Sequence, residues 1–197
     1  MILLVKMGVY TKVGDHGKTA FFGCGMIQKD DPRIEALGAV DELNSIVGVT
    51  LSMVGDKGLS EVLTKIQHDL FQVGADIAGS ALEKKALPRI TQAHIQEVEK
   101  AIDMIEEQLG TPAKFILPGG TQASSFLHLC RAITRRSERE LVKAKKVIDI
   151  NPELMIYVNR LSDFFFMLAR QANNEVHFKE QQPIYKYFDE KEVEKNE

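Results

Sequence analysis

The chain has 197 residues, 44% of them apolar and 27% charged, which is an ordinary composition for one folded globular domain. The formal net charge of -3 argues against a general nucleic-acid-binding surface, so any anion site has to be local. Cys24 and Cys130 form neither a zinc-binding pattern nor a disulfide framework, and a reducing, cytoplasmic setting fits them. No apolar stretch approaches the roughly 18 residues that a membrane span requires.

The N-terminal 30 residues do not show helical periodicity. Residues 1–7 are apolar but too short for a signal-peptide core, and Met7 is an alternative start. Residues 8–30 are rich in glycine, which predicts an ordered loop with short extended pieces such as residues 19–22.

A phosphate-binding motif is suggested within this loop. Glycines allow backbone N–H groups to turn toward a phosphate, and lysine and threonine add a charge and a hydroxyl. The run Gly17-Lys18-Thr19 is like the end of a P-loop, but Lys12 stands where the first glycine of that motif should be. The pattern therefore indicates a phosphate loop of another kind, or an ordinary turn.

Five stretches with apolar residues at helical spacing follow the loop. Asp31-Pro32 and Asn151-Pro152 each place a capping residue before a proline, a typical helix start. The predicted helices cover about residues 32–53, 60–77, 91–110, 122–146 and 151–176. Helices of about 20 residues joined by short links predict an all-α, five-helix antiparallel bundle of the ferritin-like class, in a single domain.

Two other segments are predicted to lie outside the bundle. Residues 79–90 read as a loop. The charged tail, residues 178–197, is expected to be partly loose, although residues 183–185 are apolar enough to dock on the bundle.

The fourth predicted helix carries a row of arginines. Arg131, Arg135 and Arg139 are four residues apart and so share one face, opposite an apolar face. Neighbouring guanidinium groups repel one another unless an anion or carboxylates neutralise them, and arginine forks suit triphosphate oxygens. The alternative is a solvated basic stripe paired with Glu138 and Glu140, which is the commoner arrangement for a charge run.

Polar residues on two other helices are candidates for pairing with these arginines. Asn159 and Asp163 lie one turn apart among apolar residues, and a carboxylate in that setting is usually paired. Asp41 is placed to meet an arginine at a helix interface, whereas Glu42 is expected at the surface. The histidines share no ligand spacing and are expected at the surface or at helix caps, and residues 164–166, three phenylalanines, are expected in the core.

Four stretches of the chain together resemble the PduO-type ATP:cob(I)alamin adenosyltransferases, also called corrinoid adenosyltransferases. They are YTKVGDHGKT at 10–19, GAVDELN at 38–44, FILPGG at 115–120 running on through the arginine row, and VNRLSD at 158–163. The resemblance covers about residues 8–176 in the same order. Val13 departs from it, because the family usually has a hydroxyl residue there, and residues 26–28 are less basic than is common before Lys29.

The resemblance implies a homotrimer with each active site between neighbouring subunits. Residues of the loop would cradle ATP: Thr11, Lys12, Gly14, Asp15, Gly17, Lys18, Thr19 and Lys29. Residues of the adjacent chain would complete the nucleotide site: Arg135, Glu138, Arg139 and Asn159.

The resemblance also implies residues that act on the corrin. Asp41 and Arg131 would form an inter-subunit salt bridge beside it, and Asp163 would support the arginines. Phe115 would press on the lower face of the corrin and keep its axial base away from cobalt.

The implied reaction moves the 5′-deoxyadenosyl group of ATP, with Mg²⁺, onto the Co(I) of a reduced corrinoid and releases triphosphate. Co(I) is itself the nucleophile, in agreement with the lack of a convincing nucleophile–base pair in the sequence. The implied partners are a flavin-type reductase and an adenosylcobalamin-dependent enzyme, with no nucleic acid, no membrane and no protein-bound metal. Two alternatives stay open: a non-catalytic bundle that binds or delivers nucleotide or cobalamin, and a nucleic-acid-binding bundle.

Overall fold

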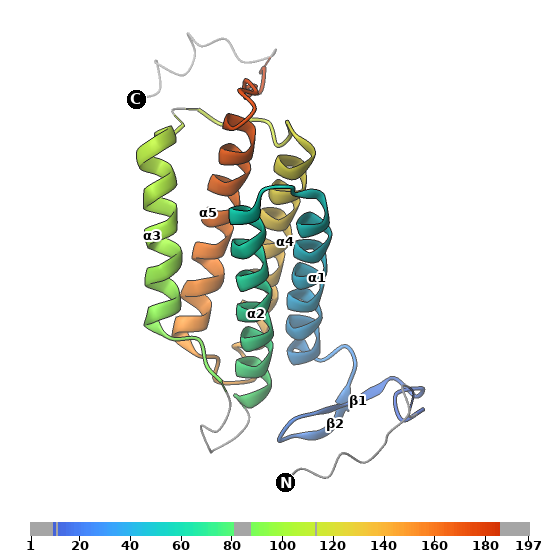
Figure 1. Ribbon diagram of the computed structural model, residues 1–197. Coiled ribbons are helices and arrows are strands. Elements are labelled where there is room, and N and C mark those ends of the chain that lie inside the picture. Colours follow the sequence, from blue (N-terminus) through green and yellow to red (C-terminus); the bar gives the residue numbers. More distant parts are fainter. Residues whose placement is uncertain (1–9, 11, 81–87, 113, 186–197) are drawn as a thin grey trace, which may run out of the picture.

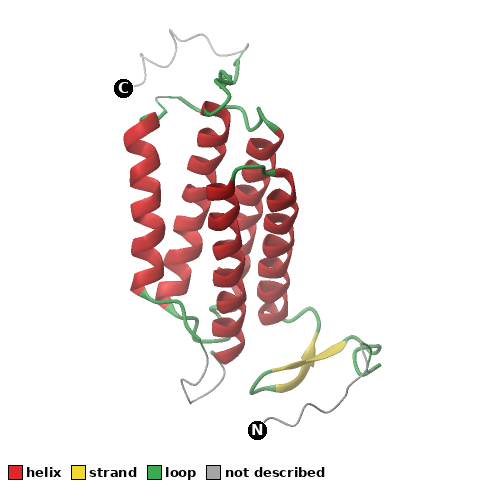
Figure 2. Ribbon diagram, viewed as in Figure 1, coloured by secondary structure: helices red, strands yellow, loops and turns green. Residues whose placement is uncertain are grey.

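The computed structural model describes residues 10, 12–80, 88–112 and 114–185. The described residues form a five-helix bundle preceded by a two-stranded hairpin (Figures 1 and 2). The helices are α1 (Pro32–Met53), α2 (Lys57–Gly79), α3 (Gln92–Leu109), α4 (Gln122–Ala144) and α5 (Pro152–Asn174). The antiparallel strands are β1 (Lys18–Phe21) and β2 (Gly25–Gln28). The predicted fold class is thus confirmed.

The helix boundaries follow the capping signals in the sequence. Asp31 accepts a hydrogen bond from the Arg33 backbone N–H at 3.0 Å and starts α1. Thr91 and His94 form a capping box at the start of α3, and Gly110 ends that helix with φ of 70°. The second helix begins three residues earlier than predicted, because the Asp56 side chain caps it by accepting from the Leu59 N–H.

Successive helices run in opposite directions, so that α1, α3 and α5 point one way and α2 and α4 the other (Figure 1). α4 packs against both α5 and α1, while α2 covers α1 and α3 covers α5. The apolar stripes that predicted the helices meet in one core, where Leu43, Leu63, Leu127 and Phe165 are fully buried. Among the described residues, every helix is too short or too polar to cross a lipid bilayer.

The extended piece predicted at residues 19–22 is confirmed by β1, but β2 and its pairing with β1 were not predicted, since these four-residue strands carry no alternating apolar pattern. It projects from the bundle at the start of α1 (Figure 1), and neither strand packs extensively against a helix. Phe21 anchors it: this side chain is buried, and the Arg33 guanidinium lies over its ring at 5.4 Å. The glycine-rich segment is therefore an arm attached to α1.

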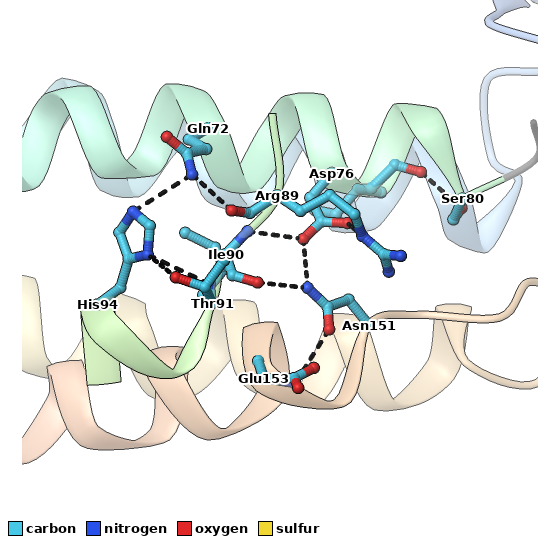
Figure 3. A network of polar contacts seen from close by, with 10 residues as sticks. Gln72, Asp76, Ser80, Arg89, Ile90, Thr91, His94, Asn151 and Glu153 are labelled. Atoms are coloured by element: carbon cyan, nitrogen blue, oxygen red, sulfur yellow. Dashed lines mark hydrogen bonds and ion pairs between the residues drawn. The ribbon is translucent and has the colours of Figure 1, made fainter. Parts of the chain in front are cut away.

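A buried polar network joins the ends of three helices (Figure 3). The Asp76 carboxylate of α2 accepts hydrogen bonds from the Ile90 N–H at 3.0 Å and from Asn151 Nδ2 at 2.6 Å. Arg89 Nε donates to the other carboxylate oxygen at 3.1 Å. Because Asn151 also caps α5, accepting from the Glu153 N–H, Asp76 fixes the approach to α3 and the start of α5 together.

Two expectations about single residues or segments need correction. His128 is buried, with 4% of its surface exposed, whereas the sequence placed it at the surface. In the tail, Ile184 and Tyr185 are exposed and do not dock, while Gln181 does, because its carbonyl accepts a hydrogen bond from the Leu117 N–H. Residues 186–197, 81–87 and the alternative start at Met7 lie outside the described residues.

Candidate active site

The arginine row of α4 has no carboxylate partner among the described residues. Glu140 pairs with Lys143, and the Glu42 side chain of α1 pairs with Arg136. Arg139 Nη1 instead donates to the carbonyl oxygen of Arg135 at 3.0 Å. The alternative, a solvated basic stripe paired with Glu138 and Glu140, holds only in part: Arg135 and Arg139 are exposed, but neither pairs with these glutamates. The guanidinium groups of the row are therefore not neutralised by carboxylates of the described residues. They repel one another, and a bound anion would relieve that repulsion.

Glu138 is engaged by α5. Asn159 Nδ2 donates to Glu138 Oε1 at 2.9 Å, and the Asn159 oxygen accepts from Arg160 at 3.3 Å. Arg160 is in turn paired with Glu99 of α3 at 2.8 Å. The structure thus brings together Glu138 and Asn159, two residues that were predicted to bind nucleotide.

Asp163 lies one turn beyond Asn159 on α5 and is exposed. Partial burial raises the pKa of its carboxyl group, although the nearby positive charges of Arg160 and Arg135 oppose that rise. No ion pair of Asp163 is present in the described part of the chain. It is therefore placed within electrostatic reach of the arginine row without being neutralised by it.

Arg131 and His128, three residues apart on α4, both carry buried side-chain nitrogens without a hydrogen-bond partner in the described part of the chain. The Arg131 Nε atom and both His128 ring nitrogens are buried without a hydrogen-bond partner in the described residues. The ring of Phe166 on α5 lies 6.1 Å from the His128 ring. Burial, followed by the charge of Arg131, lowers the pKa of His128 to about 4. Buried polar atoms normally have hydrogen-bond partners, so these three nitrogens make this part of α4 unusual within the described residues.

Asp41 lies exposed on α1 and forms no ion pair with any described residue of its own chain. Arg131, its predicted partner, likewise forms none. A single chain does not bring the two side chains together as an ion pair. Their contact between subunits stays a prediction.

The N-terminal loop closes on itself through Lys29. The Lys29 N–H donates to the Gly17 carbonyl at 2.9 Å, and a Cβ atom on Gly14 would lie 3.2 Å from Lys29 Nζ. Gly17, at φ of 74°, and Lys12, at φ of 60°, have left-handed backbones that turn the loop. The loop thus places the Lys29 ammonium beside Gly14 next to a left-handed turn at Gly17, an arrangement compatible with anion binding.

The other predicted loop residues differ in accessibility. Asp15 and Lys18 are exposed and Thr19 is half-buried, while Thr11 lies outside the described residues.

Phe115 lies in the connection between α3 and α4, at the end of the bundle opposite the hairpin (Figure 1). Its side chain is 83% exposed, although burial of a phenylalanine is strongly favourable. One chain therefore does not unite the N-terminal loop and Phe115 in a single site.

The sequence reasoning missed a polar group at the Phe115 end of the bundle. Arg170 and Asn173 of α5 and Glu180 of the tail line a polar cavity of about 220 Å³. Arg170 and Asn173 are 8% and 2% exposed. The sequence does contain a signal for this group, because Arg170 and Asn173 lie three residues apart within an apolar stripe of the helix. Polar residues in that position need buried hydrogen-bond partners.

Residues 9–172 match the family model described as cobalamin adenosyltransferase. The chain is 41% identical to the corrinoid adenosyltransferase of Bacillus subtilis (strain 168) over 171 residues, covering 85% of this chain and 87% of that protein. It is 40% identical to the corrinoid adenosyltransferase of Citrobacter freundii over 166 residues, covering 82% and 93%.

A solved structure has the same fold. It is a variant PduO-type ATP:corrinoid adenosyltransferase from Lactobacillus reuteri, complexed with cobalamin and ATP. The TM-score is 0.83 at 39% identity, and the alignment covers 91% of this chain and 97% of that one.

Proposed function

The chain belongs to the cobalamin adenosyltransferase family, and we propose that its N-terminal loop and the α4 arginines of an adjacent subunit bind the triphosphate of one ATP molecule. The protein is an ATP-dependent adenosyltransferase that acts on a corrinoid. The assignment of roles to individual residues is our proposal.

The observation that carries this proposal is the arginine row without carboxylate partners. Arg135 and Arg139 lack intrachain counter-ions among the described residues, while the neighbouring Arg136 is paired with Glu42. A triphosphate is a suitable counter-ion, because its oxygens accept the forked hydrogen bonds of guanidinium groups. The projecting hairpin supports a site between subunits, since it extends away from the helices of its own chain (Figure 1).

The reaction needs little covalent chemistry from the protein. The electron pair of Co(I) attacks C5′ of ATP and forms the Co–C bond, and the C5′–O bond breaks with its electron pair leaving on triphosphate. The protein orients C5′ toward cobalt and neutralises the charge that gathers on the leaving group. Arg135, Arg139 and Lys18 are placed in the second role, together with Mg²⁺. We expect Mg²⁺ to arrive on the triphosphate, because it usually retains phosphate and water ligands.

Phe115 is assigned to the corrin. An exposed aromatic ring on a loop can cover the lower face of cobalt and exclude both the axial base and water. Removal of the axial ligand makes Co(II) easier to reduce to Co(I), and this is the difficult step before adenosyl transfer.

Asp41 and Arg131 are assigned to the contact between subunits beside the corrin. The buried, unpartnered Nε of Arg131 supports this assignment, because a carboxylate from another chain would satisfy it. Asp163 is assigned to support Arg135, whose charge already acts on it.

The assembly is a homotrimer in this proposal. Large apolar side chains of α1 and α4 are available for subunit contact: Val49, Met53 and Leu129 are 40%, 41% and 43% exposed. A flavin-type reductase would supply Co(I), and an adenosylcobalamin-dependent enzyme would use the product. We place the protein in the cytoplasm, where a reducing medium preserves the exposed free thiol of Cys24.

The function is tested by mixing the protein with ATP, Mg²⁺ and chemically reduced cobalamin and recording the absorbance spectrum. Conversion to the spectrum of the adenosylated corrinoid is expected. ATP and cobalamin binding without conversion would support the alternative, a non-catalytic bundle that binds or delivers its ligands.

A further inference from the structure

Phe115 lies in the connection between α3 and α4, residues 110–121, whose described residues, 110–112 and 114–121, form neither helix nor strand. Such a connection is mobile unless its backbone groups are bonded to rigid elements. The bonds that hold it therefore decide where the exposed Phe115 ring lies.

Asn173 of α5 holds the end of this connection. Its Nδ2 donates to the Gly119 carbonyl at 3.0 Å, and its Oδ1 accepts from the Thr121 N–H at 3.0 Å. The side-chain amide therefore pairs with the backbone on both sides of Gly120, as a peptide group of a neighbouring strand would. With 2% of its surface exposed, Asn173 has little access to water as a substitute partner.

Gly120 makes this close approach possible. It has φ of 116°, and a Cβ atom built on it would lie 2.1 Å from Asn173 Oδ1. Any other residue at this position would displace the Asn173 amide, in addition to the strain of the backbone conformation. The glycine and the asparagine thus act as one unit.

Arg170, one turn earlier on α5, holds the beginning of the connection. Its Nη1 donates to the Gly110 carbonyl at 2.6 Å, and its Nε pairs with Glu180 at 3.3 Å. The guanidinium also lies over the ring of Phe166 at 6.0 Å, which restricts its orientation. The middle of the connection is held by the tail, through the 2.8 Å hydrogen bond from the Leu117 N–H to the Gln181 carbonyl.

We propose that Arg170 and Asn173 are positioning residues for the adenosyl transfer, which hold both ends of the Phe115 segment on α5 and so fix the phenylalanine against the corrin. This inference rests on the role of Phe115 proposed above. Neither residue needs to touch a substrate, because each acts through the backbone of residues 110–121.

The test compares Asn173→Ala and Gly120→Ala with Phe115→Ala in the full-length protein, using Mg-ATP and reduced cobalamin. Loss of the two bonds of Asn173 is expected to lower turnover about tenfold, with the Kd for ATP within about twofold of wild type. Arg170→Lys, which keeps the charge but loses the fork, is expected to lower turnover less than Arg170→Ala. Asn174→Ala is the control, since this exposed neighbour makes no side-chain hydrogen bond among the described residues.

A double-mutant cycle shows whether the effect passes through Phe115. Asn173→Ala is expected to lower turnover in the wild type and to change it little when Phe115 is already alanine. The Co(II) electron paramagnetic resonance spectrum is a second readout, in which both single variants should retain more of the axial-nitrogen signal than wild type. Thermal melting shows whether each variant is folded and so separates these effects from misfolding. If Asn173→Ala does not fold, Asn173→Asp replaces it in the test, because aspartate retains the oxygen that accepts from the Thr121 N–H.

The outcomes separate the two proposals. If Phe115→Ala lowers turnover while folded Asn173 and Arg170 variants keep wild-type turnover and spectra, the positioning proposal is overturned. Equal effects of Asn173→Ala in both backgrounds would also overturn it. If Phe115→Ala itself leaves turnover unchanged, the assigned role of Phe115 is what fails.

Discussion

Asn159 Nδ2 donates a 2.9 Å hydrogen bond to Glu138 Oε1, and this contact between α5 and α4 engages the acidic residue that stands between Arg135 and Arg139 in the sequence. A glutamate three residues after Arg135 on the same helix would otherwise be available to neutralise that arginine. With Glu138 held by an amide, the guanidinium groups remain available for an anionic substrate.

Arg135→Ala is expected to reduce kcat/KM by the equivalent of about 2–4 kcal/mol of transition-state stabilisation. Removal of one hydrogen-bond donor that stabilises developing charge has an effect of this size in other enzymes. Steady-state assays with Mg-ATP and reduced cobalamin measure this effect. Arg136→Ala is the matched control, because this arginine already pairs with Glu42 at the surface, and such pairs contribute less than about 1 kcal/mol. Equal kcat/KM for both variants would contradict the assigned role.

Phe115→Ala is expected to reduce turnover strongly and to leave the Kd for ATP almost unchanged, since the ring is assigned to the corrin alone. ATP binding by calorimetry and turnover by absorbance are measured on the same preparation. Phe71→Ala on α2 is the control, as this phenylalanine is also exposed, at 74% against 83%. Parallel losses of ATP affinity and turnover would count against the assignment.

Gly17→Ala is expected to weaken ATP binding, because φ of 74° costs a residue with a Cβ atom about 1–2 kcal/mol. The loop would relax and move the Gly17 carbonyl away from the Lys29 N–H. Calorimetric titration with Mg-ATP measures the change. Gly55→Ala should be silent, since its backbone is not left-handed and an added Cβ meets no atom within 4 Å. An unchanged Kd in Gly17→Ala would argue that the loop does not contact ATP.

Asp76→Ala is expected to lower the free energy of unfolding by about 3–5 kcal/mol, because it leaves a partly buried cation and the buried Ile90 N–H unpaired and removes one of the two hydrogen bonds of Asn151 Nδ2. Denaturant or thermal unfolding measures the loss. Asp103→Ala, at an exposed position of α3, should change stability by less than about 0.5 kcal/mol. A loss no greater than that of Asp103→Ala would contradict the structural role of the network in Figure 3.

His128 is expected to make stability depend on pH. Its pKa is about 4 in the folded protein, below the ordinary 6.5, so the unfolded chain binds the proton more tightly. Stability is therefore complete above pH 6.5 and falls as the pH drops toward 4, by about 2 kcal/mol at pH 5. The melting temperature of wild type should fall more between pH 7 and pH 5 than that of His128→Gln, at equal protein concentration. Parallel pH profiles would show that His128 is not held neutral in the folded state.

The helices were predictable because each boundary carries its own signal. Asp31, Thr91, Gly110 and Asn151 act locally, through caps that need no knowledge of the rest of the chain. The hairpin was not predictable in this way, since short glycine-flanked strands such as Gly25–Gln28 pair without a periodic apolar pattern.

The site was only partly predictable, because its bonds join residues that are distant in the sequence. The spacing of the arginine row was visible, but the engagement of Glu138 by Asn159 depends on how α5 packs against α4. Burial of His128 and the bonds of Asn173 to Gly119 and Thr121 likewise exist only once the bundle is assembled. Contacts between subunits depend in the same way on assembly, in this case of several chains, and they remain predictions.

The most direct test of an ATP site shared by two subunits is complementation between Lys18→Ala and Arg135→Ala, each of which is expected to have strongly reduced activity alone. The two variants are mixed in equal amounts, partly unfolded and reassembled, and adenosylation of reduced cobalamin is measured. In a site built from the loop of one chain and the arginines of the next, random assembly restores both residues in about one quarter of the sites, so about one quarter of wild-type activity should return. Wild-type protein taken through the same procedure controls for losses, and no recovery beyond the separate variants would contradict a shared site.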